Sequence, residues 1–177
     1  FYPGSALDIE SFLDDIRSSR AYGDQMVHVR EVPAREARYG DTERPLPPSL
    51  TVMLREGGIE RLYSHQARAI DLVRDGQDVL VATGTASGKT LCYSLPILER
   101  LLENPESRSL LLFPTKALCQ DQFKGFREAL DAVGIDDVLS GVYDGDTPSR
   151  TRRKLRDGAS ALFSNPDMLH SALMPGH

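Results

Sequence analysis

The chain has 177 residues, 40% of them hydrophobic and 27% charged, with a formal net charge of −5, which suits one soluble globular domain and argues against a broadly basic nucleic-acid coat protein. Two cysteines, Cys92 and Cys119, provide neither a disulfide framework nor a metal cluster. The apolar runs are too short to span a membrane and the first residues do not form a signal peptide, so we expect a cytoplasmic protein.

The beginning of the chain predicts a small helix and an irregular segment. Residues 5–19 place apolar side chains at helical spacing, and Ser5 is the expected N-cap. Residues 26–32 alternate weakly between apolar and polar side chains, which is typical of a strand or an extended arm. We expect this region to be an appendage, whose role the sequence does not indicate.

A linker is expected next. Residues 40–48 hold three prolines beside charged side chains, a linker composition. A short helix over residues 49–56 follows and ends at a pair of glycines. We therefore predict an N-terminal appendage and linker over residues 1–57, and a main domain over residues 58–177.

From residue 58 onward, helical and strand patterns alternate along the chain. Helices are expected over residues 64–75, 88–103, 115–133 and 148–157, and short strands over residues 78–82, 109–113, 138–143 and 159–164. This alternation predicts parallel βαβ units with right-handed crossovers. The expected fold class is therefore α/β, with a parallel sheet and flanking helices, preceded by a small helical N-terminal segment.

The strongest functional signal is the stretch TGTASGKT over residues 83–90. It follows a predicted strand and opens an apolar helix, the context of a phosphate-binding loop. Backbone N–H groups there bind phosphate oxygens, and Lys89 adds a positive charge for the β- and γ-phosphates of ATP. Thr90 offers its hydroxyl to Mg²⁺. The predicted nucleotide-binding residues are Thr85, Ala86, Ser87, Gly88, Lys89 and Thr90, with Lys89 also catalytic. The usual first glycine of such a loop is Thr83 here.

Four flanking stretches narrow the class of phosphate-loop protein. They are LYSHQ at residues 62–66, FPTKAL at 113–118, YDGDTP at 143–148 and NPDMLH at 165–170. In this order they resemble the Q motif, motif Ia and the later DNA-contacting motifs of superfamily 2 helicases of the DEAD/DEAH-box-like class. The residues of these motifs are similar to those of the MrfA-type branch, a RecQ-related group implicated in DNA repair. Each stretch taken alone is also compatible with an ordinary turn between a strand and a helix.

The resemblance implies roles for particular residues. Gln66 would read the edge of adenine, because an amide both donates and accepts; the alternative is a polar residue that caps its helix. The implied nucleic-acid-binding residues are Pro114, Thr115, Lys116, Asp144, Gly145, Asn165 and Pro166. A basic run on the helix at residues 148–157 either holds a nucleic-acid backbone or is a solvated helix face.

The resemblance also implies a partial RecA-like ATPase domain that moves on single-stranded DNA in the 3′ to 5′ direction. Such motors need a further acidic motif whose aspartate holds Mg²⁺ and whose glutamate orients water. The motif does not occur by His177, so we expect the chain to be the truncated first part of an ATP-dependent DNA helicase, inactive alone. The alternatives are a non-catalytic nucleotide- or nucleic-acid-binding module, and a phosphate-loop nucleotide kinase or GTPase.

Overall fold

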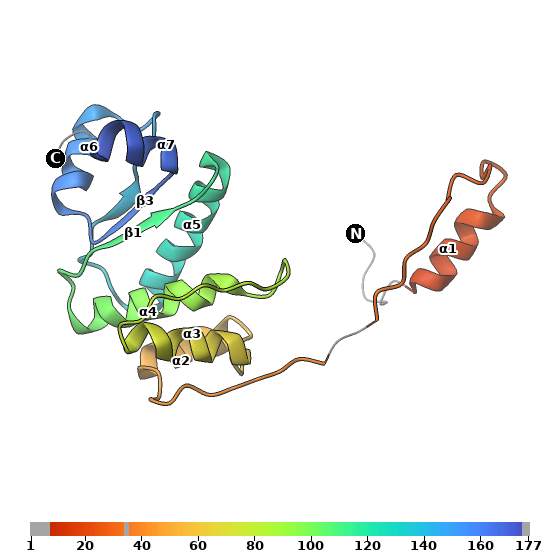
Figure 1. Cartoon of the computed structure of the whole chain (residues 1–177), viewed down its shortest axis with the longest axis horizontal. Helices are drawn as coiled ribbons and strands as arrows, with labels where there is room; N and C mark the ends of the chain where they lie inside the picture. Colours follow the sequence, from red (N-terminus) through yellow and green to blue (C-terminus); the bar gives the residue numbers. More distant parts are fainter. Residues whose placement is uncertain (1–7, 34–35, 175–177) are drawn as a thin grey trace. The chain divides into compact units, whose positions relative to one another are not determined.

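The structure is a computed structural model that describes residues 8–33 and 36–174. The chain divides into two compact units, Phe1–Glu36 and Ala37–His177 (Figure 1). No helix among the described residues is both long enough and apolar enough to span a membrane.

The first unit contains a single described helix, α1 (Ile9–Ser18). It begins after Asp8, whose carboxylate accepts the backbone N–H of Glu10 at 3.2 Å. The expected cap, Ser5, lies outside the described residues. No residue of α1 is buried, and residues 26–32 form no strand. The helical spacing of apolar residues therefore predicted α1 correctly. The weak alternation of apolar and polar residues over 26–32 does not produce a paired strand.

The second unit is α/β, as predicted. Its elements are α2 (Pro48–Glu56), α3 (Ser64–Arg74), α4 (Lys89–Glu103), β1 (Ser109–Leu112), α5 (Lys116–Val133), β2 (Ser140–Val142), α6 (Ser149–Gly158), β3 (Ala161–Ser164), α7 (Pro166–Met168) and the π-helical turn η1 (Leu169–Leu173). The strands form a parallel sheet in the order β1-β3-β2. Because the strands are parallel, their carboxyl ends lie at one edge, where the turns after them meet.

The two faces of β3 pack against different helices. Ala161 and Phe163 belong to the main core with Phe126 of α5, whereas Leu162 packs with Leu155 of α6. This alternation follows from the two-residue period of a strand. Helices α5 and α6 therefore cover opposite faces of the sheet (Figure 1). Phe163 is almost fully buried, and its ring lies 5.3 Å, centroid to centroid, from that of Phe126.

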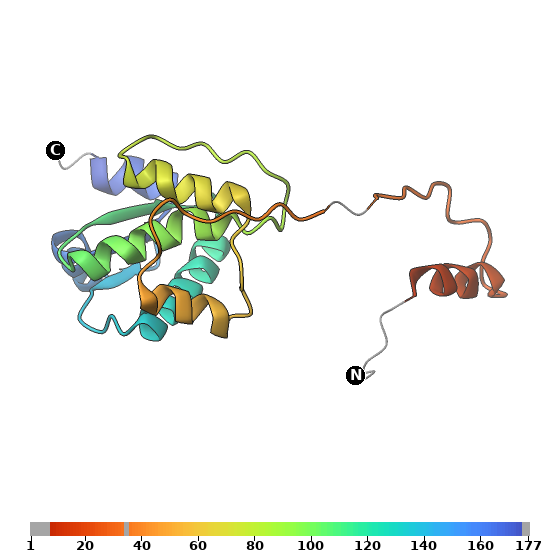
Figure 2. The same ribbon diagram turned by 90° about the horizontal axis from the view of Figure 1, so that it is seen from below.

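A helical layer made of α2, α3 and α4 completes the unit. Helices α3 and α4 pack against each other, as Figure 2 shows. Leu50 and Leu54 of α2 are buried in the same core as Leu95 and Leu98 of α4. These leucines make α2 part of the second unit, which begins at Ala37, upstream of the boundary expected after residue 57.

The expected strand at residues 78–82 is wrong for this structure. The segment pairs with no described strand, and the Leu80 side chain is 93% exposed. A groove of about 730 Å³ is lined by Val79 and Val81 of this segment and by Ser109 at the start of β1. A run of apolar residues indicates that a segment suits burial in a sheet, but pairing needs an adjacent strand, and the described chain supplies none there.

Candidate nucleotide and nucleic-acid sites

The predicted phosphate loop leads directly into a helix. Helix α4 begins at Lys89, and Gly88 before it has a left-handed backbone with φ 72° and ψ 29°. Ala86 also has a positive φ, 56°. A side chain at Gly88 would collide with the amide of Gln66 as well as being strained by the backbone. The positive φ therefore favours glycine at this position, and any side chain would also have to displace the Gln66 amide.

Lys89 points into its own loop. Its ammonium donates to the backbone carbonyl of Thr83 at 3.0 Å and to that of Gly84, and it lies 3.4 Å from the Ser87 hydroxyl oxygen. Thr83 and Ser87 share a hydrogen bond of 2.6 Å between their hydroxyls. The loop is thus closed around the lysine, and a phosphate would compete with these carbonyls for the ammonium.

Two side chains of α3 hold the loop in place. The Gln66 amide donates to the Gly88 carbonyl at 2.9 Å and accepts the backbone N–H of Tyr63 at 2.8 Å. The His65 ring nitrogen Nε2 lies 3.0 Å from the Ser87 carbonyl oxygen. Gln66 is only 2% exposed. In this structure its amide caps the start of α3, which is the alternative role given in the sequence analysis, and it has no exposed edge to offer adenine. The contact of His65 with the loop was not predicted.

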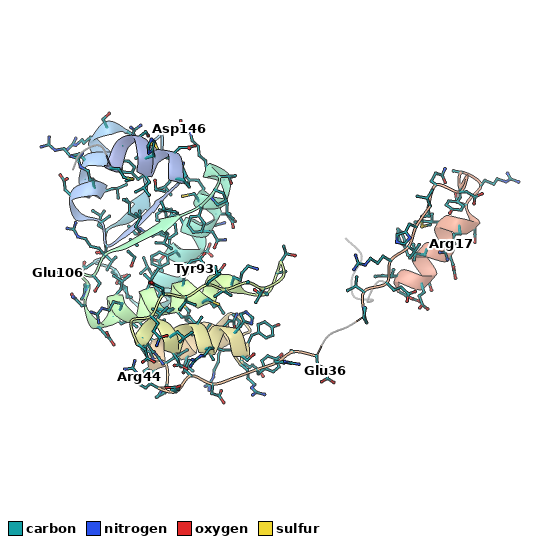
Figure 3. The ribbon with its side chains drawn as sticks, in the orientation of Figure 1. Arg17, Glu36, Arg44, Tyr93, Glu106 and Asp146 are labelled. Carbon is teal, nitrogen blue, oxygen red and sulfur yellow. The ribbon has the colours of Figure 1, made fainter. Side chains whose placement is uncertain are left out.

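Thr90, the expected Mg²⁺ ligand, is exposed at the first turn of α4. Its hydroxyl donates to Gln122 of α5 at 3.2 Å. The hydroxyl of Tyr93, the residue labelled in Figure 3, donates to the same amide oxygen at 2.7 Å. A hydroxyl at this place fits a Mg²⁺ ligand, provided that it exchanges its bond to Gln122 for the metal. The stretch QDQ at residues 120–122 also resembles part of motif Ia, but the contact of Gln122 with Thr90 was not predicted, because only the fold brings the two together.

The first candidate nucleic-acid turn lies between β1 and α5. Pro114, Thr115 and Lys116 are all exposed. Thr115 is the N-cap of α5, and its hydroxyl accepts the backbone N–H of Leu118 at 3.2 Å. The start of this long helix presents free N–H groups and the positive end of its dipole, which favour an anion.

The second turn follows β2 and is built around a buried carboxylate. Asp144 accepts the backbone N–H groups of Asp146 and Thr147, each at 3.0 Å, and the Thr147 hydroxyl at 2.9 Å. Burial opposes ionisation, but the hydrogen bonds from Thr147 and Asp146 hold the pKa of the Asp144 carboxyl below its usual range. Asp144 therefore shapes the turn and has little surface to offer a ligand.

The third turn follows β3. Asn165 is buried and caps α7, accepting the backbone N–H of Met168 at 2.9 Å, and Pro166 is the first residue of that helix. The Ser164 hydroxyl donates to the Tyr143 carbonyl at 2.7 Å, so the ends of β3 and β2 are held together. The three turns thus share one edge of the sheet, as expected from its parallel order.

One arginine of the basic run has a defined structural role. Arg152 donates to the carbonyls of Thr147 and Gly145, both at 2.7 Å, and so ties α6 to the turn after β2. Arg153, by contrast, has an 81% exposed side chain. Neither of the two interpretations of the run predicted the contact of Arg152, since it depends on how α6 folds back toward the turn.

A loop that enters α4 through left-handed Gly88, and three turns at one edge of a parallel sheet, are the arrangement of an α/β phosphate-loop domain. The family model described as "DEAD/DEAH box helicase" matches residues 63–176, and the chain belongs to this family. It is 41% identical over 169 residues to a Bacillus subtilis ATP-dependent helicase named YprA, covering 93% of this chain and 22% of the relative. It is 40% identical to the ATP-dependent helicase hrq1 of Schizosaccharomyces pombe, covering 96% of this chain and 16% of the relative.

A solved structure supports the same class. The helicase MrfA bound to DNA and AMPPNP has a TM-score of 0.81 and 38% identity, covering 95% of this chain and 23% of MrfA. The chain thus spans about a fifth of the length of the relatives that it matches. The resemblance to helicases of the MrfA type, and the RecA-like α/β fold, are confirmed.

Proposed function

We propose that this chain is the ATP-binding part of an ATP-dependent DNA helicase or translocase, with a role in DNA repair. The observation that carries the proposal is the loop closed around Lys89, with left-handed Gly88 at the start of α4. A helix start, a glycine that admits close approach and a convergent lysine are the components of a triphosphate site.

The proposed ligands are ATP and Mg²⁺ at the loop. Thr85, Ala86, Ser87, Gly88, Lys89 and Thr90 would contact the nucleotide phosphates, Thr90 the metal, and Gln66 the base after releasing one of its present partners. The metal would neutralise developing phosphate charge when bound. We further propose that the helicase is cytoplasmic.

The proposed partner is single-stranded DNA at the shared edge of the sheet. Pro114, Thr115, Lys116, Asp144, Gly145, Asn165 and Pro166 form the turns there. Backbone N–H groups and the Lys116 ammonium suit phosphate contacts, which position a strand without reading its sequence. The complex of MrfA with DNA supports a nucleic acid as the partner.

The test is ATP hydrolysis by the complete gene product with and without single-stranded DNA. We expect Lys89→Ala to lower the DNA-stimulated rate by about 10²–10³, the usual loss when one charge-stabilising group is removed. Lys124→Ala, which removes an exposed lysine of α5, is the matched control and should leave the rate unchanged.

The alternatives give different results. ATP and DNA binding without any hydrolysis by the parent protein would identify a non-catalytic module. Transfer of phosphate to a small acceptor, without a response to DNA, would identify a kinase. Full activity of Lys89→Ala would refute the catalytic role of Lys89.

A further inference from the structure

A surface ion pair joins two of the turns that we assign to nucleic acid. The Lys116 ammonium, in the first turn of α5, lies 2.6 Å from a carboxylate oxygen of Asp146, in the turn after β2. The side chains are 52% and 79% exposed. The hydrogen bond to Asp146 raises the pKa of Lys116, so the lysine is charged but already paired. Asp146 is labelled in Figure 3.

The turn that carries Asp146 is held on both sides. The Asp146 backbone N–H donates to buried Asp144 at 3.0 Å. The carbonyls of its neighbours, Gly145 and Thr147, both accept from the guanidinium of Arg152 at 2.7 Å. A carboxylate on a held turn loses less conformational entropy on pairing than one on a free loop. The turn therefore holds the Asp146 carboxylate in the position that it needs to pair with Lys116.

We infer that Asp146 competes with the nucleic-acid backbone for Lys116, and that it thereby sets the affinity of this edge for DNA. The inference rests on the proposed function, because it takes Lys116 as a phosphate contact. A carboxylate and a phosphate both accept hydrogen bonds from the same ammonium and repel each other. Binding of a phosphate must therefore either displace Asp146 from the ammonium or hold the two anions close together on it, and either outcome lowers the affinity. Asp146 is a positioning residue that acts through Lys116.

Neutralising Asp146 tests the competition. We expect Asp146→Asn to bind a fluorescein-labelled oligothymidylate about two- to fivefold more tightly at low salt, the range that an exposed ion pair permits. Fluorescence anisotropy measures the dissociation constant, and the gain should shrink at high salt because exposed charges are screened. Asp131→Asn is the matched control, since Asp131 is an exposed acid that pairs with Arg127 at 4.0 Å on α5. It removes the same charge without touching the edge.

A double substitution separates the inference from the proposed function. In a Lys116→Ala background, Asp146→Asn should tighten binding no more than Asp131→Asn does. Equal effects of Asp146→Asn and Asp131→Asn in the parent protein would overturn the competitor role, as would a gain that persists without Lys116. Unchanged affinity of Lys116→Ala alone would instead contradict the nucleic-acid role of Lys116. Failure of the parent protein to bind DNA would overturn the proposed function, and the inference with it.

Discussion

Gly88 shows how one residue serves two requirements of the phosphate loop. Gly88→Ala would force an alanine to φ 72° and push its methyl group into the Gln66 amide. We expect the free energy of unfolding to fall by about 1–3 kcal/mol, from backbone strain and the displaced side chain. Urea unfolding measures the loss, and binding of a fluorescent ATP analogue should be lost as well. Gly125→Ala is the control, because a side chain there meets nothing within 4 Å and the residue lies on α5, outside the loop.

Asp144 should make the stability of the unit depend on pH. The pKa of its carboxyl is lowered in the folded chain. The ionised carboxylate therefore contributes its full stabilisation of the folded state at pH values above the ordinary aspartate pKa of about 4. The contribution is lost as the pH falls through the lower, folded pKa. We expect Asp144→Asn to cost about 1 kcal/mol at neutral pH, through weaker hydrogen bonds, and progressively less in acid. Urea unfolding at several pH values measures this difference.

The control for Asp144 is Asp136→Asn. Asp136 is exposed, so its substitution should change the free energy of unfolding little at neutral pH. A constant difference between parent and Asp144→Asn across the acidic range would contradict the proposed role of the carboxylate.

Helices α3 and α4 are joined by a buried ion pair. Arg74 donates to both oxygens of Glu99, at 2.9 and 2.7 Å, and to Asp71 at 3.3 Å. Its side chain is only 7% exposed. We expect Arg74→Met to lower the free energy of unfolding by roughly 3 kcal/mol, because it leaves two carboxylates buried without a cation. Chemical denaturation tests this, with Arg100→Met as the control.

Arg100 makes a suitable control because it lies on the same helix as Glu99 but in solvent. It is 69% exposed and pairs with Glu103 at 3.2 Å. Exposed pairs contribute at most about 1 kcal/mol, so its loss should be small. Equal costs for the two arginines would mean that the pair of Arg74 and Glu99 is not effectively buried.

The helices were predicted well because their signals are local. The N-cap Thr115 and the left-handed Gly134 bound α5, and the apolar spacing gives the face that carries Phe126 and Leu130. The strand expected at residues 78–82 failed for the opposite reason. A run of apolar residues indicates that a segment is suited to burial, but a strand forms only when a neighbouring strand supplies its hydrogen bonds.

The contacts at the candidate sites likewise fall into local ones, which the sequence predicts, and long-range ones, which it does not. The loop around Gly88 and Lys89 was predictable, since its residues are consecutive and its chemistry is local. The contacts of Gln122 with Thr90, and of Asp146 with Lys116, join residues about thirty positions apart. Each such contact depends on the packing of a helix or turn against another, which no single stretch of sequence encodes.

The division of the chain into two units predicts where it tolerates truncation. Each unit is compact by itself, and no residue of α1 is buried. A protein that begins at Ala37 should unfold at the same urea midpoint as the parent, with its ellipticity otherwise unchanged. A lower midpoint would show that residues before Ala37 stabilise the second unit.

A protein that begins at residue 58 should behave differently, because it lacks α2. Leu50 and Leu54 are buried in the main core, and each contributes about 1.5–3 kcal/mol of hydrophobic stabilisation. Their loss exposes the partners of α2 on α4 and α5 and removes a large part of a stability that is typically only about 5–15 kcal/mol. Urea unfolding of the two truncated proteins side by side decides the boundary: equal midpoints favour a domain that starts after residue 57, and a lower midpoint for the shorter protein favours one that starts at Ala37.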